Sequence, residues 1–224
     1  SVAVATFETP TQQLLIESEL IIQHYNESPL NFIVSDYAIN YPFKYLANDN
    51  FILSSYMVLP NEETRTLLNN WIYNVYKYNE KIQTYTLLQK LTTYIFKNFT
   101  YKVREEAGVQ TAKQTLSYGS GSCRDFAFLF MEVVKCLGLA TRFVSGYLYA
   151  PLMSDKVGST HAWAEVYLPG GGWIGFDPTT GNIAGTDHIS VAVSRLPDNV
   201  PPIAGSFLGV SDSTISVGVW VTKV

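Results

Sequence analysis

The spacing of hydrophobic residues predicts three helices in the middle of the chain. Apolar side chains recur every three to four positions over 61–76, 84–98 and 123–137, which gives each stretch one face suited to burial. Asn61 is the expected N-cap of the first helix, and Gly138 supplies the stop signal of the last.

Alternation of apolar and polar residues predicts strands on either side of these helices. The clearest case is 161–168, where His161, Trp163, Glu165 and Tyr167 share one face. A Pro-Gly-Gly-Gly turn separates this strand from the next one and favours a hairpin. The other stretches with strand character are 2–7, 14–22, 31–39, 101–103, 141–150, 173–177, 189–193, 203–210 and 214–222.

These patterns divide the chain into three expected parts. Residues 1–60 are expected to be β-rich and to form an intact or partial small sandwich. Residues 61–182 are expected to form the main core, and 183–224 a C-terminal β extension packed on it. With 224 residues, of which 47% are apolar, the chain is long enough to bury a sizeable core.

Charge and hydropathy argue against two classes of partner. The net charge is −4, and lysine and arginine form no cluster, so nucleic acid and anionic membrane surfaces are not expected to bind. No apolar run approaches the ~18–20 residues of a membrane span. The two cysteines lie 13 positions apart on one predicted helix, about 20 Å, too far for a disulfide. Free thiols favour a reducing compartment, so we expect a cytoplasmic location.

Cys123 stands where a nucleophilic cysteine would be built. It follows a Gly/Ser loop and opens an apolar helix, where unpaired N–H groups and the helix dipole favour the thiolate. The alternative is that a cysteine fills space in the core, which is the commoner role of a free cysteine. Cys136, inside the same helix among valines and leucines, fits that alternative better than Cys123 does.

A histidine and an acid follow Cys123 in positions that suit catalysis. His161 opens one strand and Asp177 closes the next, and an even register of the hairpin places both on one face. We predict that 161 pairs with 177, which also places Glu165 opposite Trp173. Cys123, His161 and Asp177 would then supply nucleophile, base and orienting carboxylate.

Several spaced motifs resemble the transglutaminase-like superfamily, and in particular its bacterial branch, whose members are described as candidate cysteine proteases. The resemblance covers about residues 85–205. The motifs that carry it are GSCRDF at 121–126, RFVSGY at 142–147, HAWAEVY at 161–167, GWIGFDPT at 172–179, HISVAV at 188–193 and VPP at 200–202.

The resemblance implies an α+β, papain-like fold in which the cysteine helix packs on an antiparallel sheet, preceded by the β-rich N-terminal region. It also implies acyl-enzyme chemistry on a peptide or protein amide, either hydrolysis or transfer from glutamine to an amine. We expect the catalytic core at 61–182, and neither a cofactor nor a metal. Carried over motif by motif, the triad is Cys123, His161 and Asp177.

The other candidate residues are assigned by chemistry and place. A second oxyanion donor besides the Cys123 N–H could be Gln114 or Tyr118, and Trp163 or Trp173 could line an acyl pocket. The remaining polar residues are expected to have structural roles: Arg124 and Asp125 as a pair or cap near the helix start, Glu165 at the sheet rim, and His24 and His188 as structural or exposed residues.

Four functions remain open at the level of sequence. A cysteine-dependent amide hydrolase comes first, because water is the default acceptor of an acyl-enzyme. Transglutaminase acyl transfer from glutamine to an amine would require that water be kept from the thioester. A non-catalytic interaction module could use the same fold. A Cys/His/Asp zinc site is chemically possible, although no further cysteine or histidine motif completes it.

Overall fold

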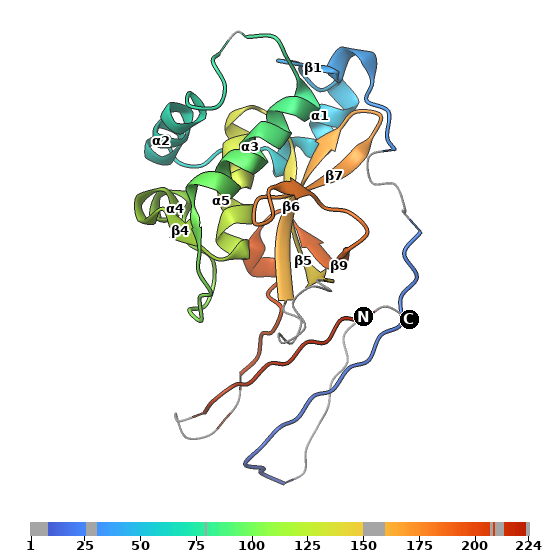
Figure 1. Cartoon of the computed structure of the whole chain (residues 1–224), viewed down its shortest axis with the longest axis vertical. Coiled ribbons are helices and arrows are strands. Elements are labelled where there is room, and N and C mark those ends of the chain that lie inside the picture. The colour runs from blue at the N-terminus through green and yellow to red at the C-terminus, as the bar shows by residue number, and fades with distance from the viewer. Residues whose placement is uncertain are drawn as a thin grey trace.

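The protein is an α+β domain in which helices cover a five-stranded sheet, as a computed structural model shows (Figure 1). The structure describes residues 9–25, 31–78, 80–149, 160–206, 208 and 213–222. The predicted strand at 2–7 lies outside these residues. The predicted fold class is confirmed. The predicted three-part division into domains stays a prediction.

The helix that begins at Cys123 lies at the centre of the fold. This helix, α5 (Cys123–Cys136), packs against the sheet and against α2 (Glu62–Ile72), α3 (Thr84–Asn98) and α4 (Ala112–Tyr118). Almost every side chain of α5 is buried, including several aromatic and aliphatic residues that are fully enclosed. A shorter helix, α1 (Ala47–Leu53), and three 3-10 turns complete the helical elements described: η1 (Asp36–Ala38), η2 (Ser54–Tyr56) and η3 (Pro197–Asn199).

The local signals read from the sequence position these helices. The side chain of Asn61 accepts a hydrogen bond from Thr64 N at 2.9 Å, which confirms it as the N-cap of α2. Gly138 has φ of 76°, a left-handed conformation that costs glycine little, and it follows the C-cap of α5.

The main sheet is antiparallel and has the strand order β8-β7-β6-β5-β9. Along β6 the small and apolar residues on one face join the core under α5, while His161 and Trp163 lie on the other face. The strands are β5 (Thr141–Leu148), β6 (Thr160–Leu168), β7 (Gly172–Asp177), β8 (Asn182–Ile183) and β9 (His188–Ser194).

The hairpin of β6 and β7 has the expected parity but a different register. Glu165 pairs with Gly175, and Tyr167 pairs with Trp173, so the predicted pairing of Glu165 with Trp173 was wrong by two residues. The observed turn between Leu168 and Gly172 is centred on Gly170, whereas the predicted register requires a centre at residue 169, and this one-residue difference shifts the pairing by two. A shift of two keeps every side chain on its face, so Asp177 still shares a face with His161.

Two very short sheets tie loops to the core. Strand β1 (Asn40–Tyr41) pairs antiparallel with β2 (Ile82–Gln83). Strand β3 (Thr100–Tyr101) pairs in parallel with β4 (Ser120–Gly121), which places Tyr101 beside the loop that precedes Cys123. The backbone N–H groups of Thr100 and Lys102 donate to the carbonyls of Gly119 and Gly121, each at 2.8 Å.

The N-terminal region differs most from expectation. Residues 14–22 are exposed on both faces and form no strand, and 31–39 contain a 3-10 turn instead of one. Alternation alone does not make a strand, because a strand also needs a partner with which to exchange hydrogen bonds. Residues 40–60 hold the two-residue strand β1 and helix α1, and Tyr41, Tyr45 and Leu53 are buried in the main core.

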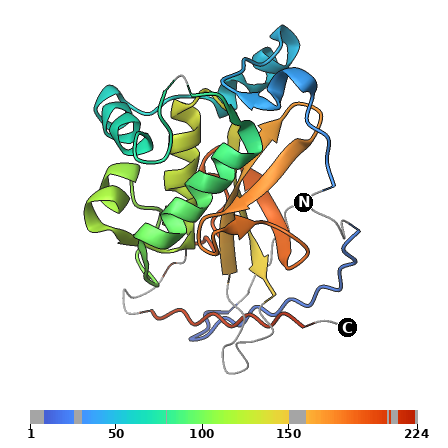
Figure 2. The same ribbon diagram turned by 45° about the horizontal axis from the view of Figure 1, so that its top comes forward.

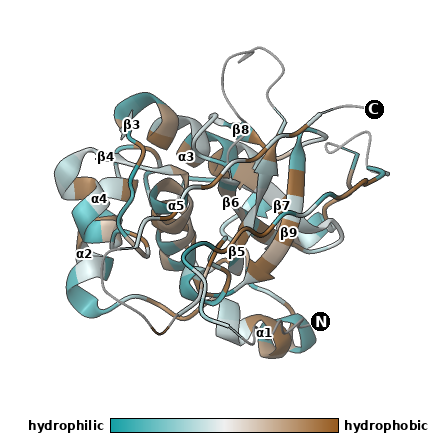
Figure 3. Cartoon of the chain, turned by 90° about the horizontal axis from the view of Figure 1, so that it is seen from below, coloured by the Kyte–Doolittle hydropathy of each residue, from teal (hydrophilic) through white to brown (hydrophobic). Residues whose placement is uncertain are grey.

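The strands predicted for the C-terminal tail are correct in part. Strand β9 forms where 189–193 predicted it, and it pairs with β5 as an integral strand of the sheet. The described residues of 203–210 and 214–222 form no strand. The blue N-terminal and red C-terminal arms run outside the packed domain (Figures 1 and 2), and hydropathy colouring shows apolar stretches along them (Figure 3). Among the described residues, no helix combines the length and hydropathy needed to cross a membrane.

Candidate active site

Cys123 occupies the first position of α5, as the sequence predicts, and its thiol is free and partly exposed. A capping box fixes this end of the helix, because Asp125 accepts hydrogen bonds from Ser122 N at 2.7 Å and Ser122 Oγ at 2.8 Å. Gly121 leaves room for this arrangement, since a Cβ there would lie 2.8 Å from the Cβ of Asp125. The thiol therefore sits on a rigid turn at the positive end of a helix.

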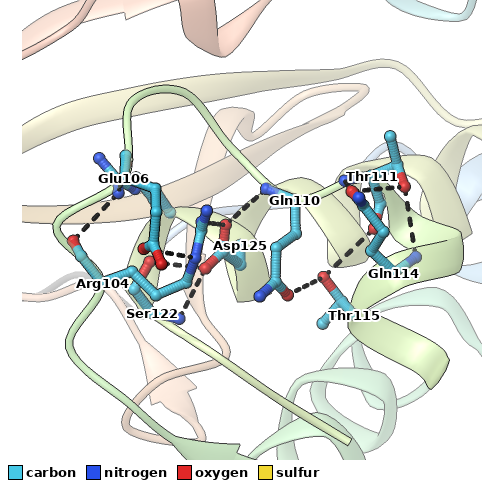
Figure 4. Close-up of polar contacts among 9 residues, drawn as sticks. Arg104, Glu106, Gln110, Thr111, Gln114, Thr115, Ser122 and Asp125 are labelled. Atoms are coloured by element: carbon cyan, nitrogen blue, oxygen red, sulfur yellow. Dashed lines mark hydrogen bonds and ion pairs between the residues drawn. The ribbon is translucent and has the colours of Figure 1, made fainter. Parts of the chain in front are cut away.

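Asp125 is the anchor of this turn and is fully buried. Its Oδ1 accepts hydrogen bonds from Arg104 Nη1 and Gln110 N, both at 2.7 Å (Figure 4). Burial acts to raise the pKa of Asp125, but the bonds from Gln110, Ser122 and Arg104 outweigh it and lower the pKa. The expected role of Asp125 as a cap is confirmed, but its ionic partner is Arg104. Arg124 instead donates to the backbone carbonyls of Arg104 and Glu106.

We expect Asp125→Ala to lower the free energy of unfolding by about 3–5 kcal/mol, because it removes the buried acceptor of Ser122 N, Gln110 N and Arg104 Nη1. Since the native pKa of Asp125 is lowered, its contribution is present at neutral pH and is lost as the pH falls below about 4. Urea unfolding at pH 7 and pH 3.5 measures both effects. Glu63→Ala, which breaks the exposed Lys113–Glu63 pair, is the control and should cost less than about 1 kcal/mol. Equal losses in the two variants would contradict the anchoring role.

His161 and Asp177 meet as the sequence predicts. His161 Nε2 lies 2.9 Å from Asp177 Oδ2, and both residues are buried. Asp177 Oδ1 accepts from Thr179 N at 2.8 Å, and Oδ2 also accepts from Thr180 Oγ1 at 3.0 Å. Burial acts to raise the pKa of Asp177, but the bonds from His161 and His188 lower it well below its usual range.

Cys123 lies within reach of the His161 ring. Because Nε2 faces Asp177, the other ring nitrogen, Nδ1, is the one left for the thiol. Burial opposes protonation of the ring, but the hydrogen bonds and charges of Asp177 and Cys123 outweigh it and raise the pKa of His161 to about 10. The structure thus joins Cys123, His161 and Asp177 in the predicted order, with the histidine suited to carry a proton at neutral pH.

Tyr101 is a site residue that the sequence reading missed. Burial, and then the charge and hydrogen bond of Cys123, raise the pKa of Tyr101 to about 12, which keeps its hydroxyl protonated and able to donate. The two-residue ladder of β3 and β4 brings Tyr101 to the thiol. No periodicity reveals a pairing that short between segments some twenty residues apart.

The two predicted pocket tryptophans lie in different places. Trp163 is at the site, where its ring is stacked on His161 with centroids 6.1 Å apart. Trp173 pairs with Tyr167, six residues along β6 from His161, which is about 20 Å. It lines a separate cavity of about 180 Å³ with Tyr56, and the Arg142 guanidinium lies 4.4 Å from its ring centroid.

The two predicted oxyanion donors point elsewhere. The side-chain oxygen of Gln114 accepts hydrogen bonds from Thr111 N and Oγ1, so this residue serves the capping box of α4 (Figure 4). Tyr118 is exposed and lines an open groove of about 710 Å³ together with the loop 102–106, Ser120 and Gly121. Two of its lining residues, Ser120 and Gly121, shortly precede Cys123 in the chain.

His188 is buried at the site, although we expected it to be structural or exposed. His188 Nε2 lies 3.0 Å from Asp177 Oδ2, so His161, Asp177 and His188 form a cluster of metal-binding residue types. However, Gly185 N–H donates to His188 Nδ1 at 3.1 Å, which places the proton of the ring on Nε2. A protonated nitrogen offers no lone pair to a metal ion, and the arrangement does not fit a metal site.

Comparison with known proteins finds a family model that matches the part of the chain that holds Cys123, His161 and Asp177. Residues 76–178 match the family model of the transglutaminase-like superfamily. An uncharacterized protein of Mycobacterium leprae is 36% identical over 109 residues, which are 46% of this chain and 38% of the relative. An uncharacterized protein of Mycobacterium tuberculosis is 31% identical over 138 residues, 58% of this chain and 44% of the relative. The chain thus spans less than half the length of these relatives.

A solved structure supports the fold. A candidate cysteine protease from Cytophaga hutchinsonii has a TM-score of 0.53 and 24% sequence identity over 69% of this chain and 50% of its own. The family match includes the cysteine, the histidine and the aspartate that the structure brings together. Residues 76–178, less than half of the chain, are therefore similar to the transglutaminase-like superfamily.

Proposed function

We propose that this protein is a cysteine-dependent amide hydrolase that acts on peptides or proteins through a thioester intermediate. The observation that carries the proposal is the 2.9 Å contact of His161 Nε2 with the buried carboxylate of Asp177, with the ring placed against a thiol at a helix N-terminus. A non-catalytic module would not need a charge-paired histidine held in this way.

The first half of the reaction forms the thioester. The Cys123 thiolate attacks the carbonyl carbon, a C–S bond forms, and the carbonyl electrons move to the oxygen. When the C–N bond breaks, Nδ1 of His161 gives its proton to the leaving amine. Asp177 accepts from Nε2 throughout, which keeps Nδ1 directed at the reacting atoms.

The second half returns the enzyme to its starting state. Nδ1 of His161, now unprotonated, takes a proton from water, and the resulting hydroxide attacks the thioester carbon. The C–S bond then breaks, the carboxylic acid leaves, and the thiolate is regenerated beside an imidazolium. The Cys123 N–H and the Tyr101 hydroxyl are the groups that we assign to the oxyanion in both halves.

We favour hydrolysis over acyl transfer because Ser120 and Gly121, which shortly precede Cys123 in the chain, line an open groove. The loop 102–106 and Tyr118 form its walls, and it exposes polar as well as apolar surface. Water that reaches the thioester through such a groove competes with any amine, whereas efficient transfer requires its exclusion. A glutamine substrate and an amine acceptor would react at this same cysteine, so the two outcomes are separated by experiment.

The test is product analysis with a peptide library, with and without a primary alkylamine. We expect new carboxyl and amino termini, together with an acyl adduct on Cys123 in a quenched reaction. If the products are amine-modified glutamines and no peptide is cleaved, the activity is acyl transfer and not hydrolysis. Absence of any adduct or product would support the interaction module.

The pH dependence of turnover should show an alkaline limb near pH 10. Because the pKa of His161 is raised, the ring keeps the proton that the leaving amine needs at neutral pH, and loses it as the pH rises through about 10. Alkylation of Cys123 by iodoacetamide needs no such proton, so its rate should not fall there. A decline of both rates at the same pH would assign the limb to unfolding instead.

A further inference from the structure

Asp177 is the acceptor for two histidines, and the proposed reaction uses only one of them. His161 Nε2 and His188 Nε2 approach the same oxygen, Oδ2, at 2.9 and 3.0 Å. His188 is the first residue of β9, and His161 lies on β6, so side chains from two strands meet at one buried carboxylate.

The ring of His188 is fixed at both nitrogens. Nδ1 accepts from Gly185 N–H, and Nε2 donates to Asp177, so the ring carries its proton on Nε2. The ring also packs edge-on against Trp163, with centroids 5.1 Å apart, and Trp163 stacks on His161. His188 is thus a neutral, oriented donor in a buried network, a role that an exposed or merely space-filling histidine would not need.

The pairing of β5 with β9 positions His188 beside Asp177. A register shift between Ser145 and Gly146 of β5 places His188 opposite Leu148. Strand β9 approaches so closely here that a Cβ on Gly146 would lie 2.1 Å from the carbonyl oxygen of Ile189. The His188 carbonyl in turn accepts from His24 Nε2 at 3.0 Å.

We propose that His188 is a positioning residue, which donates from Nε2 to Asp177 Oδ2 and so holds the carboxylate in line with His161. Its effect on catalysis rests on the proposed function. By sharing Oδ2, His188 also keeps the carboxylate from accepting a water or rotating away from His161. The groups that face this network are Asp177, His161, Cys123 and Tyr101.

Two substitutions test the proposal. His188→Ala removes the donor and should lower kcat by about 10- to 100-fold with little change in KM. His188→Gln can donate from Nε2 to Asp177 and accept from Gly185 at Oε1, so it should stay within about threefold of the wild type. His24→Ala, which removes the exposed histidine of the same network, is the matched control. Full activity of His188→Ala, or equal loss in His188→Ala and His188→Gln, would overturn the proposal.

A second measurement does not depend on turnover. The chain has three histidines, so their ring nitrogens can be assigned by nuclear magnetic resonance with His24→Ala and His188→Gln. We expect His188 to carry its proton on Nε2, with Nδ1 as the acceptor of Gly185 N–H. Protonation of both nitrogens, or a proton on Nδ1, would refute the proposal. If this form is present but no amide is turned over, the proposed function fails and the positioning of Asp177 stands.

Discussion

Cys123→Ala is expected to reduce amide turnover by a factor on the order of 10⁵ to 10⁶, because the remaining residues cannot form a thioester. The side chain is partly exposed and contributes little to the core, so the fold should be retained. Single-turnover assays measure the loss, and intact-mass analysis shows whether the acyl adduct disappears with it. Circular dichroism during thermal unfolding confirms that the variant is folded.

The matched control is the other thiol of the same helix. Burial and the charge of Glu132 raise the pKa of Cys136 to about 11, so at neutral pH its thiol is protonated and unreactive. Cys136→Ala should therefore keep its turnover and its labelling by iodoacetamide. If Cys123→Ala stays active, or if Cys136→Ala loses its labelling, Cys123 is not the nucleophile and Cys136 becomes the candidate.

Asp177→Asn is expected to lower turnover by about 10³- to 10⁴-fold although its shape is almost unchanged. The asparagine amide would donate to His161 Nε2 where Asp177 accepts, and the ring would then carry its proton on Nδ1, facing the thiol. Such a ring cannot accept a proton from water in the second half of the reaction. It cannot take the proton of the Cys123 thiol either, so formation of the adduct should slow together with turnover.

Asp177→Asn should also destabilise the fold by about 1–3 kcal/mol, since buried donors lose their acceptor. Asp187→Asn removes one negative charge from an exposed side chain next to His188 and is the control for charge alone. We expect it to leave turnover and unfolding unchanged. If both variants lose activity equally, the loss comes from the net charge and not from the hydrogen bonds of Asp177.

The sequence predicts the parts of the site that carry a local signal. Cys123 is marked by a Gly/Ser loop before an amphipathic helix, and His161 and Asp177 by the ends of two strands joined through a turn. The face shared by His161 and Asp177 follows from parity, which a register error of two residues leaves intact. These features depend on residues near one another in the chain.

The parts that were missed depend on pairings between distant segments. Tyr101 reaches the thiol through a two-residue parallel ladder, and His188 reaches Asp177 through a register shift in β5. Neither leaves a periodicity. The exposed stretch 14–22 shows the opposite error, in which a strong alternation finds no strand to pair with.

The many hydrogen bonds of Asp177 also have a consequence for how the domain opens. Thr179 N–H donates to the side chain of Asp177, and Gly181 N–H donates to the carbonyl of Asp177. Gly185 N–H donates to the ring of His188, which is itself bonded to Asp177. These amides, which lie just after β7 and β8 and outside the regular strands, should exchange with deuterium only when the carboxylate network breaks. Exchange protection in a turn then reports, amide by amide, the fraction of molecules in which the site is assembled.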